Sequence, residues 1–246
     1  MIKFLGTLRK LIFRLILLGV ASTVLLVVAY RWMPVPVTSL MVLRVVENLI
    51  EGKPVRLEKV WVESSKISPR VRQAIVASED FKFFEHSGFD WVAIEKAMKH
   101  NKRKGRIHGG STISQQTAKN VFLWPARSWV RKGFEAYFTG LIEFFWTKDR
   151  IMEVYLNVVE LGDGVYGVEA ASRTFFKKSA SELTMNEAAL LAAVLPNPRL
   201  LLVDRPSSYV RFRQSMIRRR MPAAARVMPA ALEPTKAPDL GRESKR

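Results

Sequence analysis

The sequence predicts an all-α domain over residues 45–220, preceded by one transmembrane helix. Apolar residues recur at helical spacing through most of that region, while strand-like alternation is sparse. Near the N-terminus, residues 15–30 carry no charge and are mostly Leu, Val and Ala. A length of 246 residues allows one sizeable domain with extensions at its ends.

The N-terminal apolar zone is long enough to cross a bilayer. With its flanks it covers residues 12–33, about 20 apolar positions, provided that Arg14 and Arg31 extend their charges to the interfaces. Residues 1–11 form a basic tail, which should stay cytoplasmic, so the rest of the chain should lie outside the cytoplasm.

Two alternatives to a retained anchor exist. A cleaved signal peptide is one, because Val27 and Ala29 make a tolerable cleavage site, but the apolar core is longer than such peptides need. A buried helix of a soluble protein is the other, and it is disfavoured because the segment is apolar on every side.

Proline and capping residues divide the rest of the chain into elements. Pro34 ends the anchor. Residues 38–66 read as a helix followed by an extended connector, with a strand-like piece at Trp61-Val62. Ser68-Pro69 starts a helix that should end near Glu79-Asp80, and Asp90 can cap the next helix before it dissolves into a basic loop over 99–106.

The later elements follow the same logic. Asp149 opens a helix, a loop with three glycines follows, and residues 168–176 look helical. Thr184 and Glu187 form a capping box before an apolar core helix. Ser207 or Ser208 starts a basic final helix, and residues 221–246, rich in Pro, Ala and charge, are expected to be a disordered tail.

Composition restricts the function classes. A formal charge of +18 favours an anionic partner, such as nucleic acid, membrane lipid or a phosphorylated substrate. The absence of cysteine excludes disulfides, thiolate metal sites and cysteine nucleophiles. The three histidines are too few and too poorly spaced to indicate a zinc site.

The stretch 109–120, GGSTISQQTAKN, concentrates the polar chemistry. If a helix begins after the two glycines, Ser111, Gln115 and Lys119 recur every four residues on one face, with Gln116 beside them. Hydrogen-bond donors that end in a cation suit a sugar carrying phosphate. The alternative is an ordinary solvated helix face.

Two further acidic positions suggest chemistry. Glu79 follows a helix and precedes several phenylalanines, so we expect its pKa to be raised and its carboxylate to be a better base. Arg127, Arg131 and Glu135 are spaced by four, with Lys132 adjacent, and arginines beside one glutamate are compatible with a diphosphate or metal–diphosphate site. A solvated loop and an intrahelical ion-pair ladder are the respective alternatives.

Five segments in order resemble the motifs of the peptidoglycan glycosyltransferases, glycosyltransferase family 51. They span about 100 residues, and the resemblance extends to about residue 220 and includes the anchor. The segments are EDFKFFEHSG (79–88), GGSTISQQTAKN (109–120), RKGFE (131–135), RIMEVYLN (150–157) and GVYGVEAA (164–171). The short length and the lack of Ser-x-x-Lys and Lys-Thr-Gly resemble the monofunctional members, which have no transpeptidase.

The resemblance implies a lysozyme-like fold of two helical lobes, with one lobe partly in the membrane. It implies polymerisation of lipid II, in which the growing undecaprenyl-diphosphate-linked chain is transferred with inversion to the 4-hydroxyl of lipid II. The implied location is the inner membrane, single-pass, with the N-terminus cytoplasmic and the catalytic domain periplasmic. Expected partners are lipid II, the glycan chain, membrane lipids and other cell-wall synthesis proteins, and no nucleic acid.

The resemblance also assigns roles. Glu79 would be the catalytic base and Glu135 the second essential carboxylate, either orienting cations or binding a divalent ion such as Mg²⁺ or Mn²⁺; no organic cofactor is expected. Substrate-binding positions would be Ser111, Gln115, Gln116, Lys119, Arg127, Arg131 and Lys132.

Some positions depart from the family pattern. Phe134 stands where many relatives carry a basic residue, so Arg131 or Lys132 would have to substitute for that diphosphate contact. Ser114 and Phe175 replace the commoner threonine and tyrosine. The first rival hypothesis is a lytic enzyme of the same fold, which has little use for Lys119 and Arg127. The second is a non-enzymatic basic membrane protein that anchors nucleic acid or a partner.

Overall fold

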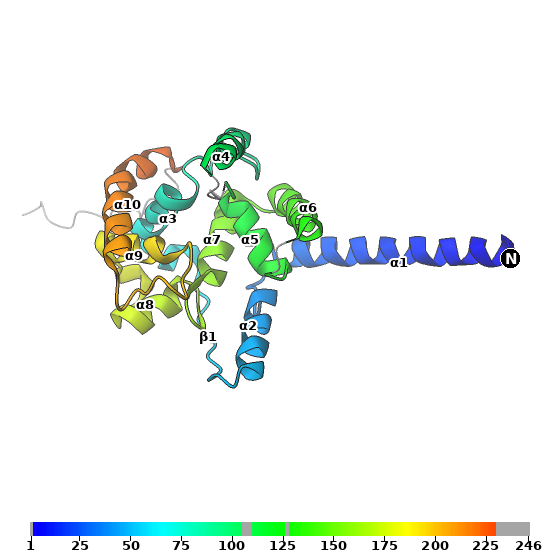
Figure 1. The fold of residues 1–246 in the computed structure, drawn as a ribbon, viewed down its shortest axis with the longest axis horizontal. Coiled ribbons are helices and arrows are strands. Elements are labelled where there is room, and N and C mark those ends of the chain that lie inside the picture. The colour runs from blue at the N-terminus through cyan, green and yellow to red at the C-terminus, as the bar shows by residue number, and fades with distance from the viewer. Residues whose placement is uncertain (1, 105–109, 126–127, 230–246) are drawn as a thin grey trace, which may run out of the picture. The chain divides into compact units, whose positions relative to one another are not determined.

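The computed structural model describes residues 2–104, 110–125 and 128–229. Over this part of the chain it is overwhelmingly helical, as predicted (Figure 1). The chain divides into two compact units. Unit 1 comprises Met1–Leu57 and Ser87–Val159, and unit 2 comprises Glu58–His86 and Glu160–Arg246.

Unit 1 is built around α5 and α6. Helix α5 contacts α6, α7 and α2, and α6 also contacts α1. Aromatic rings join these helices: Phe122 stacks on Phe138 with ring centroids 4.6 Å apart, and Tyr30 and Trp146 lie beside Phe122. The helices are α1 (Ile2–Ala29), α2 (Ser39–Ile50), α4 (Trp91–Lys104), α5 (Ile113–Phe122), α6 (Trp129–Phe145) and α7 (Lys148–Val158).

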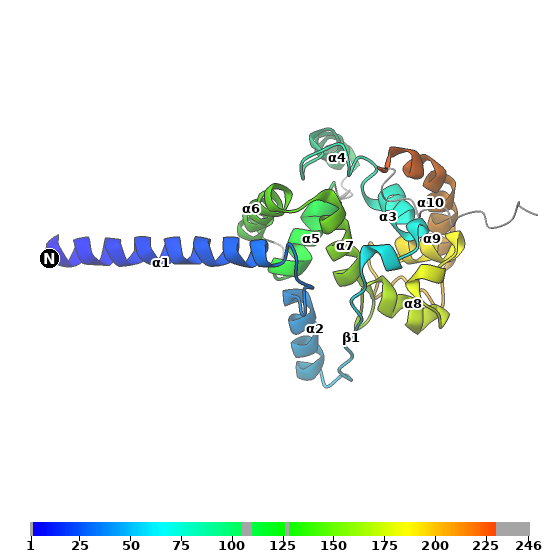
Figure 2. The same ribbon diagram turned by 180° about the vertical axis from the view of Figure 1, so that it is seen from behind.

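Helix α1 extends away from the rest of unit 1 and is the candidate membrane span (Figures 1 and 2). Within the described residues, Gly6–Ala29 is the only helix with the length and mean hydropathy, 2.6, for crossing a bilayer. The helix itself begins at Ile2 and ends at Ala29, and the predicted anchor range of 12–33 stays a prediction. The predicted basic tail is therefore helical from residue 2 onward.

The C-terminal end of α1 is fastened to α6 and α7 through its backbone. The Trp146 indole donates a hydrogen bond to the Val27 carbonyl at 2.8 Å. Arg150 donates from Nε and Nη2 to the Tyr30 carbonyl, at 3.1 and 2.9 Å, and from Nη2 to the Met33 carbonyl at 2.5 Å. The last carbonyls of a helix have no intrahelical donor, so these contacts satisfy groups that would otherwise need water.

Unit 2 packs α3 against α9 and α10. Helix α9, predicted as a core helix, is buried from Ala188 to Val194. The elements are β1 (Glu58–Lys59), η1 (Ser64–Lys66), α3 (Pro69–Glu79), β2 (Glu160–Gly162), β3 (Val165–Tyr166), α8 (Val168–Phe176), η2 (Ala180–Glu182), α9 (Met185–Val194) and α10 (Ser208–Val227).

A small three-stranded sheet is the one strand-containing feature of the described residues. β3 lies between β1, its parallel partner, and β2, its antiparallel partner. Gly164, with φ of 69°, makes the turn between β2 and β3, where a side chain would be strained. The predicted strand piece at Trp61-Val62 is wrong, since the pairing residues are Glu58 and Lys59.

Most predicted helix starts are confirmed. Asp90 accepts a hydrogen bond from the Ala93 N–H, Thr184 and Glu187 form the capping box, and Ser207 caps α10. Asp149, however, lies inside the first turn of α7, and Thr147 is the cap. Helix α4 also continues to Lys104 instead of dissolving at residue 99.

The predicted start of the C-terminal tail is also wrong. Helix α10 continues through Pro222 to Val227, and Met221 and Ala224 on this extension are buried. Burial of these apolar side chains compensates for the backbone hydrogen bond that proline removes. Residues 230–246 of the predicted tail lie outside the described residues.

We predict that Arg150→Lys weakens the attachment of α1. Burial removes water from the Arg150 guanidinium and lowers its pKa, and the nearby Glu153 carboxylate partly offsets this effect. The guanidinium therefore depends on its protein partners for hydrogen bonds. A lysine cannot donate to two carbonyls and Glu153 with the same fork, and we expect a loss of about 2 kcal/mol of stability. Thermal unfolding of the detergent-solubilised protein measures it.

The matched control is Arg205→Lys, because Arg205 is 80% exposed at its side chain and its pair with Asp204 is 3.7 Å long. This control should leave the midpoint temperature unchanged. Equal midpoints for both variants would show that Arg150 does not hold the helix end.

Candidate active site

In unit 2, the predicted base occupies a fixed helix end. Glu79 is the last residue of α3 and is half-buried, and Asp80 is the C-cap, whose N–H bonds to the Val76 carbonyl. Most of α3 is buried, including Val71, Ala74 and Ile75. Packing of these residues fixes the direction in which the helix delivers Glu79.

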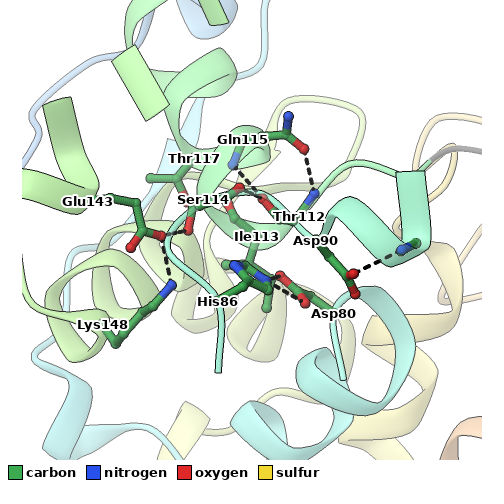
Figure 3. A network of polar contacts seen from close by, with 12 residues as sticks. Asp80, His86, Asp90, Thr112, Ile113, Ser114, Gln115, Thr117, Glu143 and Lys148 are labelled. Carbon is green, nitrogen blue, oxygen red and sulfur yellow. Dashed lines mark hydrogen bonds and ion pairs between the residues drawn. The ribbon is translucent and has the colours of Figure 1, made fainter. Parts of the chain in front are cut away.

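The residue after Glu79 forms a buried pair with a histidine. His86 Nε2 lies 3.0 Å from both carboxylate oxygens of Asp80, whose side chain is 3% exposed (Figure 3). Phe83 is fully buried within the same turn and meets Phe84 edge to face. The pair joins the two ends of the turn 80–86. The sequence carries no signal for this pair, because the turn is irregular and a spacing of six residues corresponds to no helical or strand period.

In unit 1, the glycine-rich stretch leads into α5 through a capping box. The Thr112 side chain accepts from the Gln115 N–H, and the Gln115 side chain accepts from the Thr112 N–H at 2.9 Å. The predicted helix start is thus confirmed, with Thr112 as the cap. The prediction that Ser111 shares the face of Gln115 and Lys119 is wrong, because Ser111 precedes the cap and is exposed.

The other predicted residues of α5 lie as helical spacing requires. Gln115 and Lys119 are one turn apart, and Gln115 is buried while Lys119 is half-buried in the last turn. The side-chain amide oxygen of Gln116, Oε1, accepts a hydrogen bond of 3.2 Å from the Tyr155 hydroxyl of α7. Gln115 and Gln116 therefore also have structural partners, which orient their amides.

Glu135 lies in α6 between two cations. Its side chain is 4% exposed; Arg131 Nη1 donates to one oxygen at 2.7 Å, and Lys132 pairs with the other. Arg131, Lys132 and Glu135 have the spacing of the intrahelical ion-pair ladder considered above. Glu135 is buried, however, whereas the carboxylate of a surface ion pair is exposed to solvent. The three residues carry a net charge of +1, and the side chain of Lys132 is 43% exposed.

The Glu135 carboxylate is already paired with two cationic side chains. Both of its oxygens already accept from cationic groups, which would repel a further cation. Among the residues that the structure describes, no three His, Asp or Glu side chains form a group suited to a metal. The prediction of a metal ion at Glu135 stays untested, and no step below depends on one.

A second polar network, which the sequence analysis did not find, joins α5 to α6. Ser114, fully buried, and Lys148 both donate to the same oxygen of Glu143, the lysine at 2.7 Å (Figure 3). Glu143 lies eight residues, about two turns, after Glu135 on α6. This spacing was the one feature of the sequence that could have suggested that Glu143, like Glu135, takes part in a polar network.

Gly88 allows a close approach to the same face of α6. Its φ is 88°, and a Cβ there would lie 2.8 Å from Thr139 Cγ2 and 3.0 Å from Glu143 Cγ. Its carbonyl accepts from the Thr112 hydroxyl at 2.7 Å. The start of α5 is therefore tied to the middle of α6.

The predicted site residues fall into both units. Ser111, Gln115, Gln116 and Lys119 belong to unit 1 with the Glu135 cluster, whereas Glu79 belongs to unit 2. That Glu79 and Glu135 act on one substrate stays a prediction. Arg127 lies outside the described residues.

Comparison with known proteins places this geometry in a family. The sequence model described as Transglycosylase matches residues 46–222, which contain every predicted site residue.

Relatives match over most of the chain. A "Biosynthetic peptidoglycan transglycosylase" of Bdellovibrio bacteriovorus is 56% identical over 227 residues, 92% of this chain and 91% of that protein. Proteins of the same description from Bacteroides thetaiotaomicron and Pseudomonas putida are each 50% identical, over 92% and 88% of this chain and 91% and 92% of their own lengths. The chain therefore belongs to the transglycosylase family.

Proposed function

We propose that the protein is a monofunctional peptidoglycan glycosyltransferase that polymerises lipid II into glycan strands for cell-wall synthesis. Its similarity to biosynthetic peptidoglycan transglycosylases over nine-tenths of their length supports the reaction class. The Glu135 cluster is the structural observation that supports the substrate. A buried acid with two cations and net positive charge suits a diphosphate, which a lytic enzyme acting on polymer does not meet.

In the proposed reaction, Glu79 removes the proton from the 4-hydroxyl of lipid II. The resulting oxygen attacks C1 of the growing chain's terminal sugar from the face opposite the diphosphate. A C1–O4 bond forms with inversion while the bond from C1 to the diphosphate oxygen breaks. The diphosphate leaves with its own negative charge and needs no proton, so cations suffice to stabilise it.

The cations have separate proposed roles. Lys132 and Lys119 provide ammonium groups for the diphosphate. Glu135 pairs with both Arg131 and Lys132, but its single negative charge leaves the cluster with a net positive charge. Gln115, Gln116 and Ser111 offer groups that can hydrogen-bond to sugar or phosphate. Arg127 would contribute a further cation.

The location follows from the candidate span. With α1 crossing the inner membrane and its basic end in the cytoplasm, the domain stands on the periplasmic side, where it meets membrane lipids, lipid II and the glycan chain. Other cell-wall synthesis proteins are expected partners and nucleic acid is not.

Turnover of lipid II by the purified full-length protein tests the proposal. Labelled lipid II should become polymer, with and without a chelator if no divalent ion is needed. Shortening of preformed glycan without synthesis would favour the lytic rival. Salt-sensitive DNA binding without either reaction would favour the nucleic-acid rival.

We predict that Glu79→Gln abolishes polymerisation, with a loss of at least about 10²-fold in kcat, because the amide cannot accept the proton. Lipid II binding and the thermal midpoint should be nearly unchanged. The control is Glu85→Gln, six residues further on at an exposed position, which should retain activity. Substantial turnover by the first variant would remove Glu79 from the role of base.

We predict that Lys119→Ala weakens binding of diphosphate-containing donors or of phosphoglycolipid mimics about tenfold or more, because a charge-assisted contact is lost. Titration calorimetry with the full-length protein measures the affinity. Lys53→Ala, which removes a lysine 57% exposed at its side chain, is the control and should bind normally. Unchanged affinity in Lys119→Ala would contradict the diphosphate assignment.

We predict that Glu135→Gln costs about 3 kcal/mol of stability as well as activity, because it leaves Arg131, 13% exposed, without its counter-charge. Thermal unfolding compares it with Glu63→Gln. Glu63 pairs with Lys66 at 3.9 Å with both side chains about 70% exposed, so its loss should be nearly neutral. Similar small losses in both variants would mean that the Glu135 cluster is an ordinary surface ladder.

A further inference from the structure

Helix α10 of unit 2 concentrates positive charge on an exposed surface. Over Ser208–Val227 it contains six arginines and no acidic residue. Within the part of the chain that the structure describes, none of the six forms an ion pair with a carboxylate, and all but Arg213 are exposed. The arginines are Arg211, Arg213, Arg218, Arg219, Arg220 and Arg226. The surface of α10 therefore offers uncompensated positive charge to an anion.

The stability of the helix does not explain this charge. Cations stabilise the last turn of a helix, where the dipole is negative, and of the six arginines only Arg226 lies there. Arg211 lies in the first turn, where the dipole opposes a cation, and the run Arg218–Arg220 lies between the two ends. Three consecutive like charges repel one another. A bound anion would relieve that repulsion.

Arg220 connects this surface to the proposed base. Its Cζ atom lies over the Phe81 ring, 5.7 Å from the ring centroid, which is within the range of a cation–π contact. Phe81 follows Glu79 by two residues, and both belong to unit 2 together with α10. Helix α10 packs along α3, whose last residue is Glu79 (Figures 1 and 2). The arginine surface therefore begins beside the proposed base.

The contact with Phe81 leaves the hydrogen-bond donors of Arg220 available. Attraction to an aromatic ring uses the positive charge of the guanidinium and none of its N–H groups. Among the described residues, none forms a hydrogen bond or an ion pair with the exposed Arg220 side chain. A guanidinium has five N–H donors in a planar fork that matches the two oxygens of a carboxylate. Phe81 thus holds the cation in place, and the fork can bind an acidic ligand.

The substrate that reaches Glu79 carries such acidic groups. In the proposed reaction Glu79 meets the 4-hydroxyl on the glucosamine unit of lipid II. The adjoining muramic acid unit bears a short peptide with free carboxylates. The diphosphate of the substrate is already assigned to the Glu135 cluster. The peptide carboxylates are therefore the anions that remain for a cation beside Glu79.

We propose that Arg220 binds a carboxylate of the lipid II peptide, with the adjacent Arg219 as a second cation, while Glu79 acts on the sugar. This inference rests on the proposed function and deepens it by adding a recognition site for the acidic peptide. The enzyme then selects its substrate by the charge of the peptide as well as by the diphosphate.

A comparison of two substrates tests this assignment. One is lipid II with free peptide carboxylates, and the other is lipid II whose peptide carboxylates are converted to amides. Polymerisation is measured with the full-length protein in phosphatidylcholine nanodiscs, which contain no anionic lipid. The test variant is Arg220→Gln. The matched control is Arg211→Gln, which removes another exposed arginine from the first turn of the same helix.

Arg220→Gln should raise KM for the carboxylate substrate about tenfold, the loss expected for one charge-assisted hydrogen bond. It should change KM for the amidated substrate less than about twofold, because that substrate makes no such contact. The kcat values should stay close to wild type, since the lost contact serves binding. Arg211→Gln should behave as wild type with both substrates.

Two results would overturn the peptide assignment. An unchanged KM for the carboxylate substrate is one. The other is an equal loss of kcat with both substrates, which would mean that Arg220 only supports Phe81 and the turn after Glu79. Polymerisation by the wild-type protein would still uphold the proposed function in either case, whereas its absence would refute that function itself.

Binding to the Glu79→Gln variant gives a readout that is independent of turnover. This variant should bind the carboxylate form of lipid II about tenfold more tightly than the amidated form, and adding Arg220→Gln should abolish the difference. The difference should persist when phosphatidylglycerol replaces part of the phosphatidylcholine. Its loss on that replacement would assign Arg220 to lipid headgroups and overturn the proposal.

Discussion

The buried carboxylate of Glu135 is the constraint on which the arrangement of α6 depends. Removing a carboxylate from water is costly unless cations and hydrogen bonds compensate, and here Arg131 and Lys132 of the preceding turn do so. The same helix face continues through Thr139 to Glu143, which binds Ser114 of α5. One polar face of α6 thus fixes both the charge of the site and the position of α5.

The other face of α6 is apolar and meets α1. The helix therefore separates a surface suited to anions from a surface suited to hydrocarbon, with no loop between them. A lipid diphosphate has the same division within one molecule. The apolar face is the one that meets the candidate membrane helix, α1.

Unit 2 holds one acidic side chain, Glu79, in place at the end of α3. The apolar face of α3 is buried, and the Asp80–His86 pair with Phe83 closes the turn beyond Glu79. Rigid packing behind Glu79 is what a base needs if its carboxylate is to meet a hydroxyl in one orientation. The neighbouring acid, Asp80, is paired with His86, and this pair helps to hold the turn that follows Glu79.

The sequence by itself determined the helical class, the apolar helix that is the candidate membrane span, most helix starts and the motif segments. These features depend on local periodicity, on capping and on short stretches of sequence. It correctly predicted the Thr184–Glu187 capping box, the Ser207 cap and the end of α3. Each of these features depends on residues within one helical turn. Only the tertiary structure decided that Ser114 meets Glu143, that His86 meets Asp80 and that α10 continues past Pro222. Those outcomes depend on burial against residues distant in the chain, and no local spacing encodes which buried group will receive which partner.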